Sequence, residues 1–234
     1  MNILILSATK HEVLPLVEAL GKPFFTDGKL SSFQLGKLKT DLLISGIGMV
    51  AKAFWLGKYL SWKNYDFALN LGIAGSFRPE IPIGEVVNVI KDQFSEIGAL
   101  TSAGFLTASD LHFSDFDSFP FRSGFLINQT DFTKSGIQNL KQVTGITANT
   151  VHGETNSILQ IKEQFHPDIE TMGGAAFLYG CLIEKIPCAQ IRAISNFVEE
   201  RDKSRWNIPI AVKNLTSTTL KILDDLNKST IENE

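Results

Sequence analysis

Short apolar runs alternate with helical patterns along most of the chain. The run Ile3–Leu6 has no polar position, which is typical of a strand buried on both faces. The residues after it place apolar side chains on one face of a helix that ends before Gly21 and Pro23. The same alternation continues to the C-terminal region, so helices and strands are expected to be interleaved.

The predicted elements can be stated as ranges. Strands are predicted over residues 3–6, 31–35, 41–45, 67–71, 85–90, 124–128, 145–151 and 189–194. Helices are predicted over residues 13–20, 46–60, 134–142, 157–164, 172–184 and 208–226. This order predicts one three-layer α/β/α domain over residues 1–227, with a mixed but mostly parallel central sheet, followed by a disordered tail over residues 228–234.

One long segment, residues 91–122, does not fit this pattern. Its phenylalanines are scattered among serine, aspartate and glycine without a helical or strand period. Long segments of this kind inside a compact domain are usually functional. Two interpretations stay open: the aromatic side chains pack as a lid on the domain's own core, or they are covered by a ligand or a second subunit.

Composition excludes several classes of protein. The chain has 234 residues, 44% hydrophobic and 20% charged, which is typical of a globular domain. A net charge of -3 argues against a generally basic nucleic-acid-coating protein. No apolar run approaches the roughly 18–20 residues of a membrane span. Cys181 and Cys188 lie in apolar contexts. We therefore predict a cytoplasmic protein with two buried thiols, and neither nucleic acid nor membrane as a partner.

Ligands of α/β proteins bind at the carboxyl ends of the strands, so the segments after the predicted strands hold the candidate chemistry. The segment Gly72-Ile73-Ala74-Gly75 follows a buried strand, and its glycines would let a ligand approach the backbone. It matches neither a dinucleotide fingerprint nor a P-loop, so alone it indicates only a tight turn. Arg78 could bind a phosphate, but a fuller basic anion site is not apparent nearby.

Charged residues at two strand ends could form a pair. Glu12 lies in the first turn of its predicted helix, where a carboxylate most often only compensates the helix dipole. Arg192 closes a buried strand, where an arginine usually needs a carboxylate partner. Glu12 would be that partner if the two strands are neighbours. His112 and His152 have no carboxylates at ligand spacing, so we predict no metal and no cofactor.

Four segments together resemble the nucleoside phosphorylase/nucleosidase family, in its hydrolytic branch. They are Ser45–Gly48, Gly72–Gly75, Glu170–Ala176 and Arg192–Asn196, in the order and at about the spacing of that family. The resemblance extends from Glu12 to the C-terminal helix. It implies a nucleoside phosphorylase-like fold and an enzyme that uses water to cleave the N-glycosidic bond of a purine nucleoside. It also implies a homo-oligomer, dimer or larger, in which residues 91–122 lie near a neighbouring subunit's site.

The resemblance also implies catalytic roles for three residues. Glu12 would activate or orient the water, with Arg192 close to its carboxylate, and Asn196 would face N7 of the purine. The Asn196 amide could accept from a protonated N7 and donate to a 6-oxo group, whereas the amino group of adenine would meet it donor to donor. Asn196 therefore favours a hypoxanthine-type leaving group, with an adenine-releasing nucleosidase as the alternative.

Further residues would contact the substrate by the same resemblance. They are Ile73, Ala74, Gly75, Thr155, Asn156, Met172 and Gly173. Thr155 and Asn156 would run along the base plane, although a helix N-cap is at least as good an interpretation of them.

Gly173 departs from the family pattern, which has at that position a glutamate that binds the ribose hydroxyls. Losing two hydrogen bonds to a charged group would cost roughly 3–6 kcal/mol. Three explanations stay open: a weakened site, as in a nucleoside-binding protein with impaired catalysis; an altered sequence; or compensation from elsewhere in the chain.

Overall fold

The apolar run at the start of the chain forms a strand inside the main sheet. The structure is a computed structural model that describes residues 1–102, 104–133 and 135–232. Strand β1 (Asn2–Ser7) lies between β4 (Leu38–Ile44) and β5 (Phe67–Ser76) and runs parallel to both. Ile3 to Leu6 are 0% exposed, as expected of a strand with layers on both faces.

The other strands extend this sheet on both sides. They are β2 (Phe25–Asp27), β3 (Leu30–Leu35), β6 (Val86–Asp92), β9 (Phe121–Arg122), β10 (Phe125–Ile127), β11 (Lys141–Thr147), β12 (Ile169–Thr171) and β13 (Cys188–Phe197). Their order is β2-β3-β4-β1-β5-β12-β11-β6-β10-β9, and β13 pairs with both β5 and β6. Because β13 joins those two strands, β5, β12, β11, β6 and β13 form a closed ring, which the alternation of elements did not predict.

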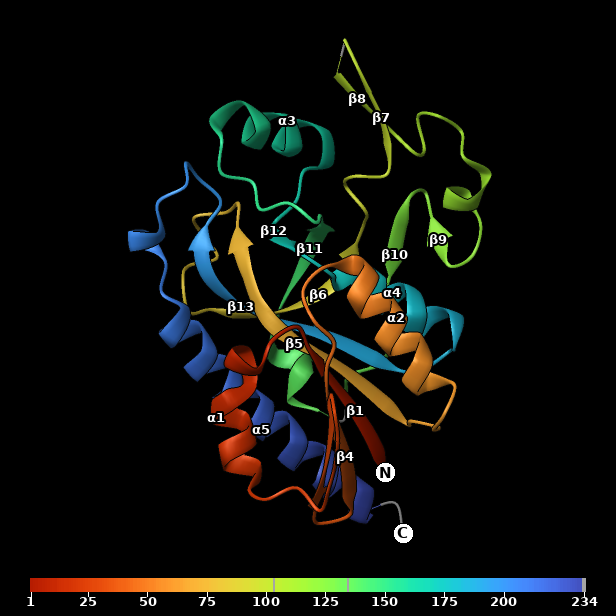
Figure 1. Ribbon diagram of the computed structural model, residues 1–234, viewed down its shortest axis with the longest axis vertical. Coiled ribbons are helices and arrows are strands. Elements are labelled where there is room, and N and C mark those ends of the chain that lie inside the picture. Colours follow the sequence, from red (N-terminus) through yellow and green to blue (C-terminus); the bar gives the residue numbers. More distant parts are fainter. Residues whose placement is uncertain (103, 134, 233–234) are drawn as a thin grey trace.

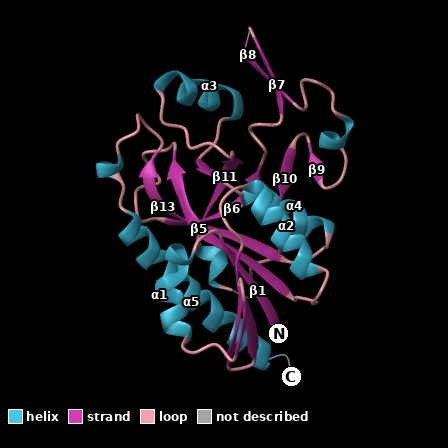
Figure 2. Ribbon diagram, in the orientation of Figure 1, coloured by secondary structure: helices cyan, strands magenta, loops and turns pink. Residues whose placement is uncertain are grey.

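Helices cover both faces of the sheet and confirm the three-layer α/β/α fold (Figures 1 and 2). Helices α1 (Lys10–Leu20) and α5 (Ile208–Glu232) lie together on one face, and α2 (Met49–Leu60) and α4 (Gly174–Ile183) lie together on the other. Helix α3 (Thr155–Phe165) lies apart from both pairs. Short 3-10 turns occur at Ser114–Asp117, Gly136–Asn139 and Lys203–Arg205.

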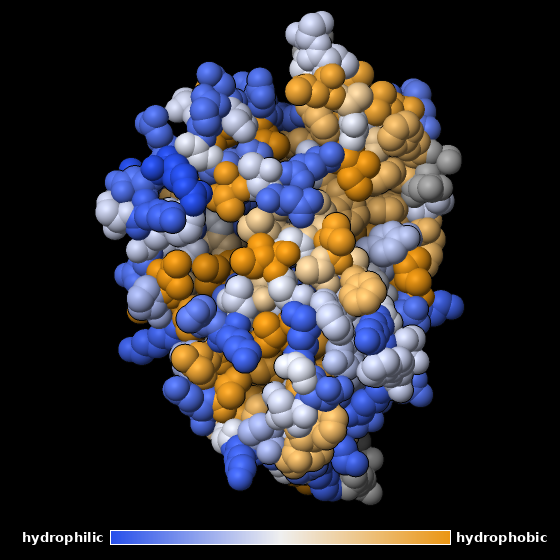
Figure 3. Space-filling model, viewed as in Figure 1, coloured by the Kyte–Doolittle hydropathy of each residue, from blue (hydrophilic) through white to orange (hydrophobic). Residues whose placement is uncertain are grey.

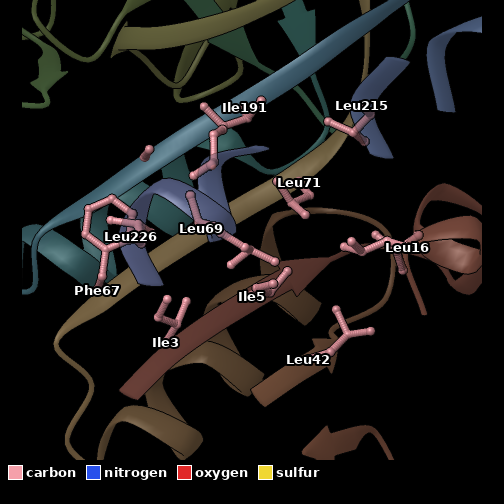
Figure 4. Packing of buried hydrophobic residues seen from close by; sticks show 14 of the residues in the cluster. Ile3, Ile5, Leu16, Leu42, Phe67, Leu69, Leu71, Ile191, Leu215 and Leu226 are labelled. Carbon is pink, nitrogen blue, oxygen red and sulfur yellow. The ribbon is translucent and has the colours of Figure 1, made fainter. Parts of the chain in front are cut away.

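The largest hydrophobic cluster lies between the sheet and the pair α1 and α5. Figure 4 shows Ile5 of β1, Leu71 of β5 and Ile191 of β13 facing Leu16 of α1 and Leu215 of α5. All of these side chains are 1% exposed or less. Burying a side chain of this size contributes about 1.5–3 kcal/mol, so this packing fixes the helices against the sheet.

Strands β5 and β13 are the two long strands that carry the glycine segment and the arginine segment. They run parallel and pair from Cys188 with Ala68 to Phe197 with Ser76, so both end at the same edge of the sheet. The register shifts between Ile194 and Asn196, which leaves Ser195 as the extra residue of a bulge. Bulges redirect side chains, and this one lies next to Asn196.

Several predicted segments differ from the structure. The strand predicted over residues 145–151 lies four residues earlier, as β11 (Lys141–Thr147). Instead of a helix over 134–142, the chain has a 3-10 turn at Gly136–Asn139 and then β11 from Lys141; Lys134 lies outside the described residues. Gly136 and Asn139 are poor helix formers, and pairing with β6 provides the strand alternative. Helix α5 continues to Glu232, so residues 228–232 are helical rather than a disordered tail.

The phenylalanine-rich segment has short elements of its own. Strands β7 (Gly98–Thr101) and β8 (Gly104–Thr107) form a separate hairpin. Phe121 packs against Phe94 and Phe116 and against Tyr179 of α4, so part of the segment covers the domain's own core. Other side chains stay exposed, including Phe119 at 66%. Figure 3 shows hydrophobic residues gathered over this part of the visible face.

Candidate active site

Glu12 is held at the start of α1 by four hydrogen bonds. Thr9 is the N-cap of the helix and forms a capping box with Glu12. Glu12 Oε2 accepts from the Thr9 backbone N–H at 2.9 Å, from Thr9 Oγ1 at 3.0 Å and from Ser7 Oγ at 3.2 Å. Glu12 Oε1 accepts from the Ile73 backbone N–H of β5 at 3.2 Å. The carboxylate therefore caps its helix and is also fixed against the glycine segment.

Gly72 makes this approach possible. A Cβ atom at Gly72 would lie 2.8 Å from Glu12 Oε1 and 3.1 Å from Arg192 Nη1. Any side chain there would displace the carboxylate or the guanidinium. The glycine is required by this close approach, since its backbone has no positive φ.

Arg192 is buried beside Glu12 but is held by other groups. Its Nη1 donates to the backbone carbonyls of Asn70 at 3.2 Å and Ile191 at 3.3 Å. Among the ion pairs of the described residues there is none between Arg192 and Glu12. Burial lowers the pKa of Arg192 to about 10, while the charges of Glu12 and Asp92 act in the opposite direction. Arg192 thus contributes a fixed positive charge near Glu12 without holding its carboxylate directly.

Asn196 and Glu170 lie together around Gly75. A Cβ atom at Gly75 would be 3.2 Å from Asn196 Nδ2 and 3.4 Å from Glu170 Cγ. The Asn196 amide accepts from Ser195 Oγ at 2.8 Å and donates to the Phe197 carbonyl at 2.9 Å. Glu170 Oε2 lies 2.7 Å from His152 Nδ1. Both side chains are only 7% exposed and line the same cavity.

These groups line one cavity of about 360 Å³ at the carboxyl ends of the central strands. Most of the predicted site residues line it: Glu12, Ile73, Ala74, Gly75, Met172, Gly173, Arg192 and Asn196. Thr155 and Asn156 do not. They lie exposed in the first turn of α3, whose N-cap is Glu154 rather than either of them. Thr150 and Val151 reach the cavity from that part of the chain instead.

Two further charged residues line the cavity without having been assigned from the sequence. Lys52 comes from the buried face of α2, and Glu170 comes from β12. The strand β12 is too short to give a recognisable pattern that would place Glu170 at a strand end. The sequence indicates Lys52 only by placing a charged residue among the apolar positions of a predicted helix.

A row of buried polar side chains runs from Lys52 across the sheet. Lys52 Nζ donates to Asn70 Oδ1 at 2.7 Å, and Asn70 Nδ2 donates to Gln190 Oε1 at 3.2 Å. Gln190 Nε2 donates to Asp92 Oδ2 at 2.8 Å. Burial raises the pKa of Asp92 to about 6, opposed by its bonds from Gln190 and Thr147. The two amides point their oxygens toward the lysine and their nitrogens toward the aspartate, which stabilises both buried charges.

The fold and the cavity define an α/β protein that takes a small ligand at the ends of its strands. The chain belongs to the phosphorylase superfamily, whose family model matches residues 2–224.

Individual relatives agree with this family. The chain is 28% identical over 191 residues to the futalosine hydrolase of Streptomyces coelicolor, covering 78% of this chain and 77% of the relative. It is 27% identical over 235 residues to the 5'-methylthioadenosine/S-adenosylhomocysteine nucleosidase of Colwellia psychrerythraea, covering 95% of each chain. The structure of the futalosine hydrolase of Helicobacter pylori superposes with a TM-score of 0.79 at 16% identity, over 96% of this chain and 98% of that one, and supports the fold.

Proposed function

We propose that this protein hydrolyses the N-glycosidic bond of a purine nucleoside that releases hypoxanthine. The observation that carries the proposal is the placement of Glu12 beside Gly72 and of Asn196 beside Gly75 in one cavity. These glycines are three positions apart on an extended strand, about 10 Å at the usual rise. That spacing suits a ligand with its sugar at the Glu12 end and its base at the Asn196 end.

Glu12 has the position of a group that orients the attacking water. Its carboxylate is fixed by four donors and faces the cavity, as a general base requires. In the transition state the sugar gains positive charge and the purine gains negative charge. The carboxylate stabilises the sugar, and hydrogen bonds to the base stabilise the leaving group.

The base end of the cavity suits a 6-oxopurine better than adenine. Asn196 Nδ2 donates one hydrogen to Phe197, which leaves its second hydrogen for the 6-oxo group. Glu170 Oε2 is engaged by His152, which leaves Oε1 to accept from N1–H of hypoxanthine. Adenine has an unprotonated N1, which would place an acceptor against the Glu170 acceptor. Its 6-amino group would place a donor against the Asn196 donor.

Among hypoxanthine nucleosides we propose futalosine, which places the reaction in menaquinone biosynthesis. Relatives from Streptomyces coelicolor and from Thermus thermophilus, 28% and 29% identical, are futalosine hydrolases. We propose water rather than phosphate as co-substrate because Arg78 is paired with Asp168 at 3.2 Å and does not line the cavity.

We further propose a cytoplasmic homo-oligomer. Exposed side chains such as Phe113 and Phe119 are available for a subunit contact, and no helix within the described residues is long and apolar enough to cross a membrane.

The test is base release from a nucleoside panel in phosphate-free buffer. We expect hypoxanthine from futalosine and, more slowly, from inosine, with little adenine from methylthioadenosine. A requirement for phosphate would make the protein a phosphorylase, and selective release of adenine would make it a methylthioadenosine nucleosidase. Binding without release would identify the nucleoside-binding protein that Gly173 suggests. Light scattering on the same preparation measures the molar mass and tests the oligomer.

A further inference from the structure

The backbone does not require glycine at position 173. Gly173 has φ -174° and ψ 16°, an extended φ that any residue adopts. The space around it is occupied by Lys52: a Cβ atom at Gly173 would lie 3.1 Å from Lys52 Cε and 3.2 Å from Lys52 Cδ. A side chain at position 173 would therefore start in tight contact with the Lys52 stem, which would have to shift by a few tenths of an ångström.

Lys52 has hydrogen-bonding capacity left for a ligand. It is 3% exposed and lines the cavity, and Asn70 Oδ1 is the acceptor for its ammonium group. An ammonium carries three hydrogens. None of the ion pairs in the described part of the chain involves Lys52. The negative charge of Glu12 favours its protonated form, and Asn70 and Gln190 connect it by hydrogen bonds to Asp92. The ammonium is therefore held in place with donors to spare.

We propose that Lys52 binds the ribose of the nucleoside, donating hydrogen bonds to its 2′ and 3′ hydroxyl oxygens beside Gly173. This inference rests on the proposed function. A hydroxyl group can donate or accept a hydrogen bond. The family's glutamate at position 173 would accept hydrogen bonds from the ribose hydroxyls, whereas Lys52 donates hydrogen bonds to the same hydroxyl oxygens. A sugar without these hydroxyls leaves the remaining donors of a buried ammonium without acceptors, which makes Lys52 a specificity-determining residue.

The positive charge of Lys52 determines whether its substitution changes KM or kcat. The sugar becomes positive in the transition state, so a nearby cation does not stabilise that state more than the bound substrate. Interactions of this kind lower KM without raising kcat. Substitution of Lys52 is therefore expected to raise KM for a ribonucleoside and to leave kcat undiminished.

The experiment compares inosine with 2′,3′-dideoxyinosine in wild type, Lys52→Met and Lys52→Gln at pH 6, where the Lys52 amine is protonated because its pKa is about 7. Lys58→Met is the matched control, because Lys58 lies on the same helix outside the cavity. Loss of a charged hydrogen bond should raise KM for inosine roughly 10- to 100-fold in Lys52→Met. KM for dideoxyinosine and Kd for hypoxanthine should stay within about twofold of the wild-type values, since neither ligand has the hydroxyls that Lys52 contacts. Lys52→Gln, which keeps a donor, should recover part of the loss.

Equal factors for the two nucleosides, or no change with inosine, would overturn the role of Lys52. A weakened Kd for hypoxanthine would count against it too, because it would show general damage to the site. If wild type binds nucleosides without releasing base, the Kd values of inosine and dideoxyinosine replace KM. The same selective loss then supports Lys52 while the proposed hydrolysis fails.

Discussion

Exchanging Asn196 for aspartate should shift the preferred leaving group from hypoxanthine toward adenine. The amide now donates to the Phe197 carbonyl at 2.9 Å and accepts from Ser195 Oγ at 2.8 Å. In Asn196→Asp one oxygen keeps the Ser195 bond, but the other faces the Phe197 carbonyl and a 6-oxo group without a hydrogen to donate. A buried polar group left unpaired costs about 1–3 kcal/mol, so kcat/KM for a hypoxanthine nucleoside should fall roughly 5- to 150-fold.

The assay is the ratio of kcat/KM for inosine to kcat/KM for methylthioadenosine, measured by chromatography of the released base. In Asn196→Asp the carboxylate would accept a hydrogen bond from the 6-amino group of adenine, which the Asn196 amide opposes as a second donor, so the ratio should move toward adenine. Asn156→Asp is the matched control: the same chemical change at an exposed position of α3 should leave the ratio unchanged. If both substrates lose the same factor in Asn196→Asp, Asn196 does not distinguish the 6-substituent and the reasoning is refuted.

Two other expectations concern charged residues that line the cavity. Glu12→Gln should lower kcat about 10²- to 10⁴-fold, the usual contribution of a general base; Glu18→Gln, on the exposed face of the same helix, should not, and equal rates would exclude Glu12 as the base. Burial, together with the charge of Arg192, lowers the pKa of Lys52 to about 7, while Glu12 opposes the shift. The unfolded chain then binds more protons between pH 7 and 10.5, so wild-type stability relative to Lys52→Met should rise over that range, by at most about 1.4 kcal/mol per pH unit. Chemical denaturation at several pH values measures this difference, and a flat or falling difference would contradict the burial of a titrating amine.

The parts of the site that could be predicted lie at the ends of long, apolar strands. The runs around Leu69 and Ile191 are long enough to be recognised as strands, and parallel strands must end at one edge of a sheet. That rule is enough to bring the Gly72 segment and the Arg192 segment together. The rule does not predict which atoms form hydrogen bonds. The charges alone predict that Arg192 holds Glu12, whereas the Arg192 guanidinium donates to backbone carbonyls.

Other features depend on contacts that no local pattern carries. Strand β12 has three residues, and its place between β5 and β11 closes the ring of strands and brings Glu170 to the cavity beside Asn196. Residues 134–142 have an apolar spacing compatible with a helix, but pairing with β6 is decided by the whole sheet. Tertiary pairing overrides propensity most easily in such short segments.

Gly173 illustrates how far one position can mislead when it is considered without its neighbours. In the sequence it is a missing carboxylate, which suggests a damaged site. In the structure its backbone tolerates any residue, and the space beside it holds a lysine that is connected by two oriented amides to Asp92. A random loss of a side chain would leave a void, which costs stability. Here Lys52 lies next to that position and is connected through Asn70 and Gln190 to Asp92, which is the arrangement on which the proposed ribose contact depends.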